Sequence, residues 1–365
     1  MMRSLREFSK LAGVSPSTVS RVFSGTGRVS PETQKRILQL AESLDFRPSA
    51  IGQVAFGGGT QSVGVLVPSL AVSFFADIVR GLQKHMLKTD HLPIVLEAET
   101  GIFDQRAVQR LLDHRVDAML LTLMSESLTP DDLGSILRSQ IPVVILGSFR
   151  ASLGLDAVDN DDLAGGRAVA EHLLGLGHRD FGFVYFGEGH TNSDQRLNGF
   201  REALAEAGVA LPTENIVSLD PHRADRERLL GDDLLKLLSR PDRPTAVFAS
   251  TDDLARAVYS TARGLGLSIP HDLSVVGYAN LNFSGLISPP LTTVDQNGLE
   301  IGHRAAQLIL DRLGSPQAPY RTEIVPVRLV VRESTARPPK TRQPTGEVPA
   351  APTPKRRTAR GTPAL

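Results

Sequence analysis

The 365-residue chain contains no cysteine, which excludes disulfides and thiolate chemistry. It has no apolar run near the roughly 18 residues that cross a bilayer. Its first residues, MMRSLREFSKLAG, lack the apolar core of a secretory signal. With 41% hydrophobic and 22% charged residues, the composition is that of a globular protein. We therefore expect a cytoplasmic protein without a membrane partner.

Recognisable catalytic motifs are also missing from the sequence. There is no GxSxG, HExxH or GxxxxGK[ST] segment. The GxG pairs, such as Gly175/Gly177 and Gly264/Gly266, lack the third glycine of a dinucleotide-binding loop. The nine histidines are dispersed, without the spacing of metal ligands. The sequence therefore predicts no enzyme, no cofactor and no metal site.

The chain has no net charge, since 40 basic residues balance 40 acidic ones, but the charge is unevenly distributed. Residues 1–62 have a net charge of +4 and residues 334–365 have +6, whereas residues 63–333 have −10. Only the two ends are suited to approach a polyanion such as DNA. Blocks of charge are also common on ordinary solvated surface, so the pattern permits DNA binding without proving it.

The first 45 residues show three helix starts. Ser4 to Glu7 has the capping-box pattern, and Gly13 provides a stop that tolerates positive φ. Ser15-Pro16 and Ser30-Pro31 each combine a capping serine with proline at the first helical position. Apolar residues at helical spacing predict the buried stripes of the first and third helices: Leu5, Phe8, Leu11, Ala12, Ile37, Leu38, Ala41 and Leu44.

Two short helices joined by a turn with glycine form a helix-turn-helix, whose second helix enters the DNA major groove. The spacing predicts that Val14, Val19 and Val22 face inward. Five polar residues are then expected to face outward as DNA contacts: Ser15, Ser17, Thr18, Ser20 and Arg21. The hydroxyls can donate to phosphates, and arginine can bind guanine. The alternative is a plain helical hairpin with a solvated polar face.

From Val63 onward, short apolar runs alternate with helical patterns. The predicted strands are 63–67, 93–98, 117–122, 142–146, 181–186, 245–249 and 273–278. This alternation is typical of parallel sheets covered by helices on both faces. About 270 residues exceed one small sheet, so we expect two lobes with a ligand cleft at the carboxyl ends of the strands.

The segments LAGVSPSTVSRV, VSPETQKRIL and FRP closely resemble the head of the lac-repressor/GalR (LacI/GalR) family of bacterial transcription regulators. VGVLVPSL, DNDDLAGGRAVAEHLLGLGHR, RLNGFREALAEAG, PTAVFASTDDLARA and DLSVVGY resemble its core blocks. The resemblance implies an all-α helix-turn-helix head on an α/β core like that of periplasmic sugar-binding proteins. Such a core has two lobes, three chain crossings and a small effector between the lobes. We thus expect a homodimeric regulator, a repressor by family habit, that binds a pseudo-palindromic operator.

We divide the chain into a head (1–47), a hinge (48–62), a two-lobed core (63–333) and a disordered, proline-rich basic tail (334–365). The tail has no leucine heptad of the kind that joins two dimers, which favours a dimer. Its KRRTAR segment is either solvated or adds non-specific attraction to DNA.

The family resemblance implies further DNA contacts at Arg47, the last residue of the head, and in the hinge at Ala50, Val54 and Ala55. Family members usually have arginines here and a leucine that wedges between base pairs. In this sequence Ala55 occupies the wedge position, and alanine has little bulk for unstacking. Either a neighbouring apolar residue takes that role or the hinge bends DNA less. We therefore expect weaker operator binding with a flatter salt dependence.

The resemblance also implies a set of effector-binding residues: Phe74, Phe75, Asp161, Asn192, Arg196, Thr251, Asp252, Asn280 and Gln296. Two departures from the family stand out: Thr251 replaces an asparagine, and Ala279 replaces an aspartate that usually accepts sugar hydroxyls. Three alternatives stay open: an anion held by Arg196, a sugar in a rearranged pocket, and loss of small-molecule control. A solute-binding protein that does not regulate genes is a further alternative, opposed by the head.

Overall fold

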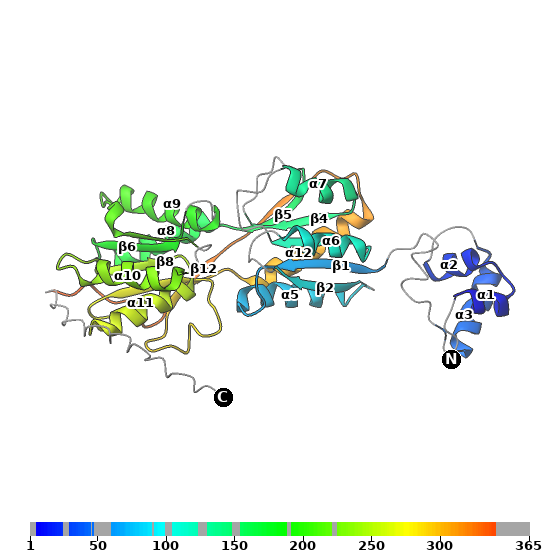
Figure 1. Cartoon of the computed structure of the whole chain (residues 1–365), viewed down its shortest axis with the longest axis horizontal. Coiled ribbons are helices and arrows are strands. Elements are labelled where there is room, and N and C mark those ends of the chain that lie inside the picture. Colours follow the sequence, from blue (N-terminus) through cyan, green and yellow to red (C-terminus); the bar gives the residue numbers. More distant parts are fainter. Residues whose placement is uncertain are drawn as a thin grey trace, which may run out of the picture.

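The computed structural model describes residues 5–24, 29–44, 46, 60–89, 91–98, 104–122, 130–147, 154–187, 191–220 and 225–340. Within these ranges the chain forms a head of three helices and two α/β lobes (Figure 1). No helix in the described ranges is long and apolar enough to cross a membrane. The predicted hinge, apart from residues 60–62, and the tail from residue 341 onward lie outside them.

The head confirms the three predicted helix starts as far as they are described. It consists of α1 (Leu5–Ala12), α2 (Pro16–Ser24) and α3 (Pro31–Ser43). Gly13, with φ of +63°, ends α1. Ser15 Oγ accepts from the Thr18 amide at 3.1 Å, and Ser30 Oγ accepts from the Thr33 amide at 3.3 Å. Each serine therefore caps the helix that follows it.

The core of the head is smaller than the apolar spacing predicts. Phe8 and Phe46 stack with ring centroids 4.2 Å apart, and Ile37 is fully buried beneath them. Leu11, Leu38 and Leu44 are 63%, 42% and 39% exposed, so their assignment to the buried stripes is wrong. Phe46, which follows α3, donates its amide to Ala41 and occupies the core position predicted for Leu44.

The first lobe contains a six-stranded sheet in the order β11-β5-β4-β3-β1-β2, with all pairs parallel. Its strands are β1 (Ser62–Val67), β2 (Leu92–Glu97), β3 (Ala118–Thr122), β4 (Val143–Leu146), β5 (Asp156–Asn160) and β11 (Thr322–Val325). Its helices are α5 (Ser73–Met86), α6 (Gln105–Asp113), α7 (Pro130–Ser139) and α12 (Gly298–Gly314). Helices α5 and α12 cover one face, and α6 and α7 the other. A Cβ at Gly302 would collide with the Ile78 carbonyl, so glycine permits the close packing of α12 on α5.

The second lobe repeats this architecture with the strand order β12-β10-β9-β8-β6-β7. Its strands are β6 (Phe181–Phe186), β7 (Ile216–Leu219), β8 (Ala246–Ala249), β9 (Ser274–Tyr278), β10 (Thr292–Asp295) and β12 (Arg328–Val330). Its helices are α8 (Asp162–Gly175), α9 (Thr191–Glu206), α10 (Arg226–Ser239) and α11 (Asp252–Gly264), with a short 3-10 turn, η2 (Thr213–Asn215). Helices α8 and α9 cover one face, and α10 and α11 the other.

One strand corrects the expectation of purely parallel sheets. β12 runs antiparallel to β10. The chain leaves β11 at the carboxyl edge of the first sheet and enters the second lobe at the edge that faces the first. A strand that starts there must run opposite to its neighbours, whose carboxyl ends point toward the same edge.

The chain passes between the lobes three times, as expected from the resemblance (Figure 1). The crossings follow β5, β10 and β11. Because each lobe is assembled from segments on both sides of these crossings, neither lobe is a continuous stretch of sequence. The carboxyl ends of both parallel sheets meet at the crossings, which is where such sheets bind ligands.

The boundary predicted between core and tail, at 333/334, is too early. Ser334 is fully buried; its hydroxyl donates to the Val275 carbonyl at 2.6 Å and accepts from the Thr292 amide at 2.8 Å. The Ala336 amide donates to Ser274 Oγ at 3.0 Å. Residues 334–336 therefore belong to the second lobe.

Candidate functional site

The start of α2 presents a cluster of hydroxyls. Ser15 is exposed, Ser17 and Thr18 are half-buried, and Ser15 Oγ lies 2.8 Å from the hydroxyl oxygens of both. Arg21, one turn further along the helix, is exposed. In a helix-turn-helix these positions meet base edges and phosphates. The structure therefore brings together four of the five predicted contacts of α2.

Ser20 is the exception, because only 2% of its surface is exposed. It follows Val19, which is fully buried, so the helical turn directs both residues toward the interior of the head. The prediction that Ser20 faces outward to DNA is wrong. The other predicted contacts, Arg47, Ala50, Val54 and Ala55, lie outside the described residues.

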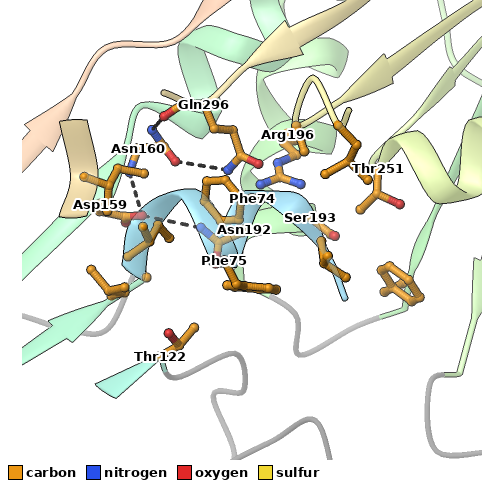
Figure 2. A pocket seen from close by; sticks show the side chains of 18 of the residues that line it. Phe74, Phe75, Thr122, Asp159, Asn160, Asn192, Ser193, Arg196, Thr251 and Gln296 are labelled. Carbon is orange, nitrogen blue, oxygen red and sulfur yellow. Dashed lines mark hydrogen bonds between the residues drawn. The ribbon is translucent and has the colours of Figure 1, made fainter. Parts of the chain in front are cut away.

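A cavity lies between the two lobes at the carboxyl edges of their sheets (Figure 2). It holds about 1010 Å³ of space free of protein atoms, part of it open to solvent. Six of the nine predicted effector residues line it: Phe74, Phe75, Asn192, Arg196, Thr251 and Gln296.

Arg196, on α9, is buried and already has partners. Its Nε donates to Asp162 Oδ1 at 2.9 Å, and its Nη1 donates to the Ser250 carbonyl at 2.7 Å. The guanidinium carbon lies 3.8 Å from the ring centroid of Tyr278. Burial by itself lowers the pKa of Arg196, but the charge and hydrogen bond of Asp162 together with the neighbouring Tyr278 outweigh this effect, and the pKa is raised. The guanidinium is therefore charged, and that charge is balanced within the protein.

Asp159 lines the cavity, although the sequence reasoning did not select it. It is the penultimate residue of β5, and its Oδ1 accepts from the Asn160 amide at 2.8 Å and from Asn192 Nδ2 at 3.4 Å. Asn192 Nδ2 also donates to Asp162 Oδ2 at 2.6 Å. The sequence offered one signal for Asp159: polar residues end the segment DAVDN directly after apolar ones. These contacts link the carboxylate at the end of β5 to the Arg196–Asp162 pair.

Asp252 does not line the cavity, in contrast to the prediction. Its carboxylate is buried and accepts from the Leu281 amide at 2.7 Å, from Ser284 Oγ at 2.5 Å and from Thr293 Oγ1 at 2.6 Å. Burial raises the pKa of Asp252, although these donors oppose the shift. It holds the loop after β9 in place, and the neighbouring Asp253 lines the cavity instead.

Asp161 and Asn280 are also absent from the cavity lining. Asp161 caps α8, where its Oδ1 accepts from the Ala164 amide at 3.0 Å. Asn280 Oδ1 accepts from Arg332 Nη2 at 2.6 Å. Both side chains are thus committed to the local structure, and we do not retain them as effector contacts.

Two lining residues, Asn160 and Gln296, connect the chain crossings (Figure 2). Asn160 Nδ2 donates to the Gln296 carbonyl at 2.9 Å and to the Val325 carbonyl at 3.3 Å. Asn160 Oδ1 accepts from Gln296 Nε2 at 3.0 Å. Since each of these three residues lies at a different crossing, one amide side chain joins all three.

The lobes also contact each other at the start of α5. The Asn282 amide of the second lobe donates to Ser73 Oγ of the first at 3.1 Å. Among the residues described, no group of three or more histidines, aspartates and glutamates could hold a metal ion. The residues that line the cavity offer hydrogen-bonding groups and apolar surface.

Two family models match the chain: "Bacterial regulatory proteins, lacI family" over residues 4–49 and "Periplasmic binding protein-like domain" over residues 170–335. The ribose operon repressor of Haemophilus influenzae is 31% identical over 336 residues, covering 91% of this chain and 98% of that protein. The structure of a complex of the transcriptional regulator CelR with cellobiose has a TM-score of 0.67 at 27% identity, covering 91% of this chain and 100% of that one. The operator-bound lac repressor dimer has a TM-score of 0.74 at 24% identity, covering 92% and 100%, and supports the fold. The chain belongs to the lacI family of bacterial regulatory proteins, and it is a DNA-binding transcriptional regulator.

Proposed function

We propose that the chain is a homodimeric repressor whose two heads read a pseudo-palindromic operator and whose cavity binds the controlling effector. One observation carries this proposal: the hydroxyl and arginine surface of α2 and a cavity that spans two hinged lobes belong to the same chain. The relatives support it, because they include the ribose operon repressor and the operator-bound lac repressor dimer. Operator DNA places such a repressor in the cytoplasm.

The proposed organisation keeps the head at 1–47, ends the hinge at 61 because β1 begins at Ser62, and extends the core from 62 to 336. The retained DNA contacts in the head are Ser15, Ser17, Thr18 and Arg21, together with the hinge positions expected from the resemblance. Effector binding changes the angle between the lobes and, through the hinge, the spacing of the two heads. No catalytic step is part of this function.

Arg21→Ala tests the assignment of the recognition helix. We first select operator sequences from random duplexes with the full chain, and then measure the Kd of the selected duplex. Loss of one bidentate arginine–guanine contact weakens the cognate complex by about 1–3 kcal/mol. Arg80→Ala, on α5 of the core, removes the same charge away from the head and leaves Kd unchanged. An unaltered cognate Kd for Arg21→Ala rejects the assignment.

The second candidate is a solute-binding protein without a regulatory role. It predicts ligand binding by the cavity and no enrichment of any duplex by the full chain. The exposed hydroxyl cluster of α2 favours the repressor, since a solute-binding protein has no use for a second, helix-turn-helix domain.

A further inference from the structure

Two histidines of the first lobe lie side by side, and neither lines the cavity between the lobes. His85 lies in the last turn of α5, and His303 lies in the second turn of α12. Their ring centroids are 4.6 Å apart, and the ring planes are inclined by 45°. More than 200 residues separate the two histidines in the sequence, so no local spacing indicates the pair.

The close packing of α5 and α12 fixes the separation of these rings. A Cβ at Gly81 would collide with the Leu299 carbonyl, as one at Gly302 would collide with the backbone of α5. His85 follows Gly81 by one helical turn, and His303 follows Gly302 directly. Both imidazoles therefore project from rigid elements in close contact, which is the arrangement that a preorganised site requires.

The separation of the rings matches that of two histidines bound to one metal ion. An imidazole nitrogen lies about 2.0–2.1 Å from Zn²⁺, which places the ring centroid about 3.2 Å from the metal. Two such rings at an angle of about 90–110° around one ion have centroids roughly 4.5–5.2 Å apart. The observed distance of 4.6 Å falls within this range.

The ring nitrogens of the pair have few partners. His85 Nδ1 is buried and has no hydrogen-bond partner among the described residues. A buried polar atom without a partner costs folding free energy, and a bound ion removes that cost. His303 is half exposed, so solvent reaches the pair, and its Nδ1 lies 3.6 Å from Glu300 Oε2. A carboxylate beside one ring nitrogen is a common feature of metal sites, where it orients the imidazole.

The surroundings of His85 favour its neutral form. Burial is the main cause that lowers the pKa of His85, and the charges of His303 and Lys88 add to this effect. Gln307, which hydrogen-bonds the ring, and the charge of Asp311 oppose the shift. The imidazole is therefore neutral at pH 7, which is the form in which histidine binds a metal.

The neighbouring carboxylates are already paired with arginines. Glu300 Oε1 accepts from Arg304 Nε at 2.8 Å, and Asp311 Oδ2 accepts from Arg321 Nη2 at 2.6 Å. Mg²⁺ and Ca²⁺ need several oxygen ligands, which this surface does not provide. Imidazole nitrogens suit Zn²⁺, Ni²⁺ and Cu²⁺. The residue types therefore favour a transition metal over a hard cation.

We propose that His85 and His303 together bind one divalent transition-metal ion, with water in the remaining coordination positions. Two protein ligands are fewer than the three or four of catalytic and structural zinc sites, so the ion is exchangeable. A bound ion joins α5 to α12, which pack on the same face of the first sheet, and so stabilises the first lobe. This inference does not depend on the proposed function, because neither histidine lies in the head or lines the cavity.

Thermal shift of the full chain, purified without a histidine tag and freed of metal with EDTA, is the first test. NiCl₂ or ZnCl₂ at 100 times its Kd raises the melting temperature by roughly 2–4 °C, whereas MgCl₂ does not raise it. The affinity falls as the pH is lowered through the ordinary histidine pKa of about 6.5, because protons compete for the ring nitrogens. No shift with either transition metal, or an equal shift with MgCl₂, overturns the proposal.

Matched variants locate the ion by calorimetry with NiCl₂. His303→Phe keeps an aromatic ring against His85 and removes the nitrogens, so the melting temperature without metal stays close to that of the wild type. The Kd for Ni²⁺ nevertheless rises at least about tenfold, and His85→Phe raises it to a similar extent. His114→Phe, at an exposed position of the same lobe, leaves Kd unchanged and is the control. Binding that keeps its affinity in His85→Phe and His303→Phe takes place elsewhere and overturns the assignment.

Pulsed EPR of the Cu²⁺-loaded protein counts the imidazoles on the metal. The wild-type protein shows two coordinated imidazoles, and each of the variants His85→Phe and His303→Phe shows fewer. A single imidazole in the wild-type protein, or two in either variant, contradicts a shared site.

Discussion

At the scale of single residues, Arg196 shows that a predicted contact can have a role in the fold. The resemblance implies that it clamps the effector, and it does line the cavity. Its Nε and Nη1, however, bind Asp162 and Ser250 inside the second lobe. Its guanidinium also packs on Tyr278, beneath which α8 and α9 meet. We infer that Arg196 mainly fixes the second lobe's side of the cavity, and that only its remaining N–H groups are available to contact ligand.

Arg196→Met tests this role by urea unfolding of the full chain. The change leaves the Asp162 carboxylate buried without its cation, and breaking such a pair costs about 3–5 kcal/mol. Arg196→Met combined with Asp162→Asn restores part of that loss, because no buried charge is then left unpaired. Arg167→Met provides the control on the same helix pair, since its ion pair with Glu206 is at the surface. Wild-type stability in Arg196→Met would mean that the guanidinium is reserved for ligand.

Several residue assignments were beyond the reach of the sequence for a common reason. In FASTDD either aspartate fits the pattern, and only the path of the following helix buries Asp252 and turns Asp253 to the cavity. Ser20 looks like a surface residue from its chemistry, yet the packing of the head buries it. Arg196, in the quoted segment RLNGFREALAEAG, and the two phenylalanines implied by the resemblance do line the cavity.

At the scale of elements, the apolar strands were predictable and the polar ones were not. FGFVYF predicted β6 with its observed limits, because an uninterrupted apolar run indicates a buried strand. DAVDN forms β5 although three of its five residues are acidic or amide. Asp156 can be buried because Arg312 Nε lies 2.8 Å from its Oδ2. The other end of the strand leads into the first chain crossing between the lobes. Such a strand depends on partners more than 100 residues away, which no local pattern shows.

The three crossings act as one element because of Asn160. Asn160→Ala removes its hydrogen bonds to Gln296 and Val325 and leaves buried carbonyls without a donor, which costs about 1–3 kcal/mol. Looser crossings also widen the distribution of lobe angles. Urea unfolding measures the first effect, and small-angle X-ray scattering measures the radius of gyration for the second. Asn282→Ala, which alters an exposed side chain and keeps the backbone contact, is the control. Unchanged stability in Asn160→Ala contradicts the role of the amide.

The segment that leads to the tail is held to the second lobe by two imidazoles, a buried one on His178 and a half-buried one on His172. His178 Nε2 lies 2.9 Å from the Ala336 carbonyl oxygen and 3.1 Å from Ser274 Oγ, and its Nδ1 lies 2.9 Å from Thr245 Oγ1. His172 Nε2 lies 3.0 Å from Thr335 Oγ1. Burial lowers the pKa of both histidines below the ordinary value of 6.5.

This arrangement predicts that acid weakens the fold. Because the folded pKa lies below 6.5, the unfolded chain binds more protons as pH falls from 6.5 toward the folded pKa values. His178 then contributes up to about 1.4 kcal/mol of lost stability per pH unit over that window, and none above it. Urea unfolding between pH 5 and 8 measures the slope. His178→Gln flattens it, whereas His271→Gln, at an exposed site, does not. Equal slopes in His178→Gln and wild type contradict this account.

At the scale of the whole molecule, the DNA-binding part and the core carry net charges of opposite sign. The head and hinge segment, residues 1–62, carries a net charge of +4, whereas residues 63–333 carry −10. A DNA polyanion therefore attracts the head and repels the core, which keeps the cavity away from the duplex. Communication between them must be mechanical, through the crossings and the hinge.

Mechanical coupling makes the two binding events mutually dependent. If a cavity ligand identified by thermal shift alters the lobe angle, it changes the Kd of the selected operator by about 5- to 150-fold, and the operator must change the Kd of that ligand by the same factor. Fluorescence anisotropy with labelled duplex measures the first, and calorimetry with and without saturating duplex measures the second. Arg21→Ala keeps ligand binding, but at duplex concentrations that no longer saturate the variant the effect of operator on ligand Kd is lost. Asn160→Ala reduces the coupling factor, because crossings that are no longer joined transmit the lobe angle less well to the hinge. An operator Kd that saturating ligand leaves unchanged in the wild-type protein means that the cavity does not control the head.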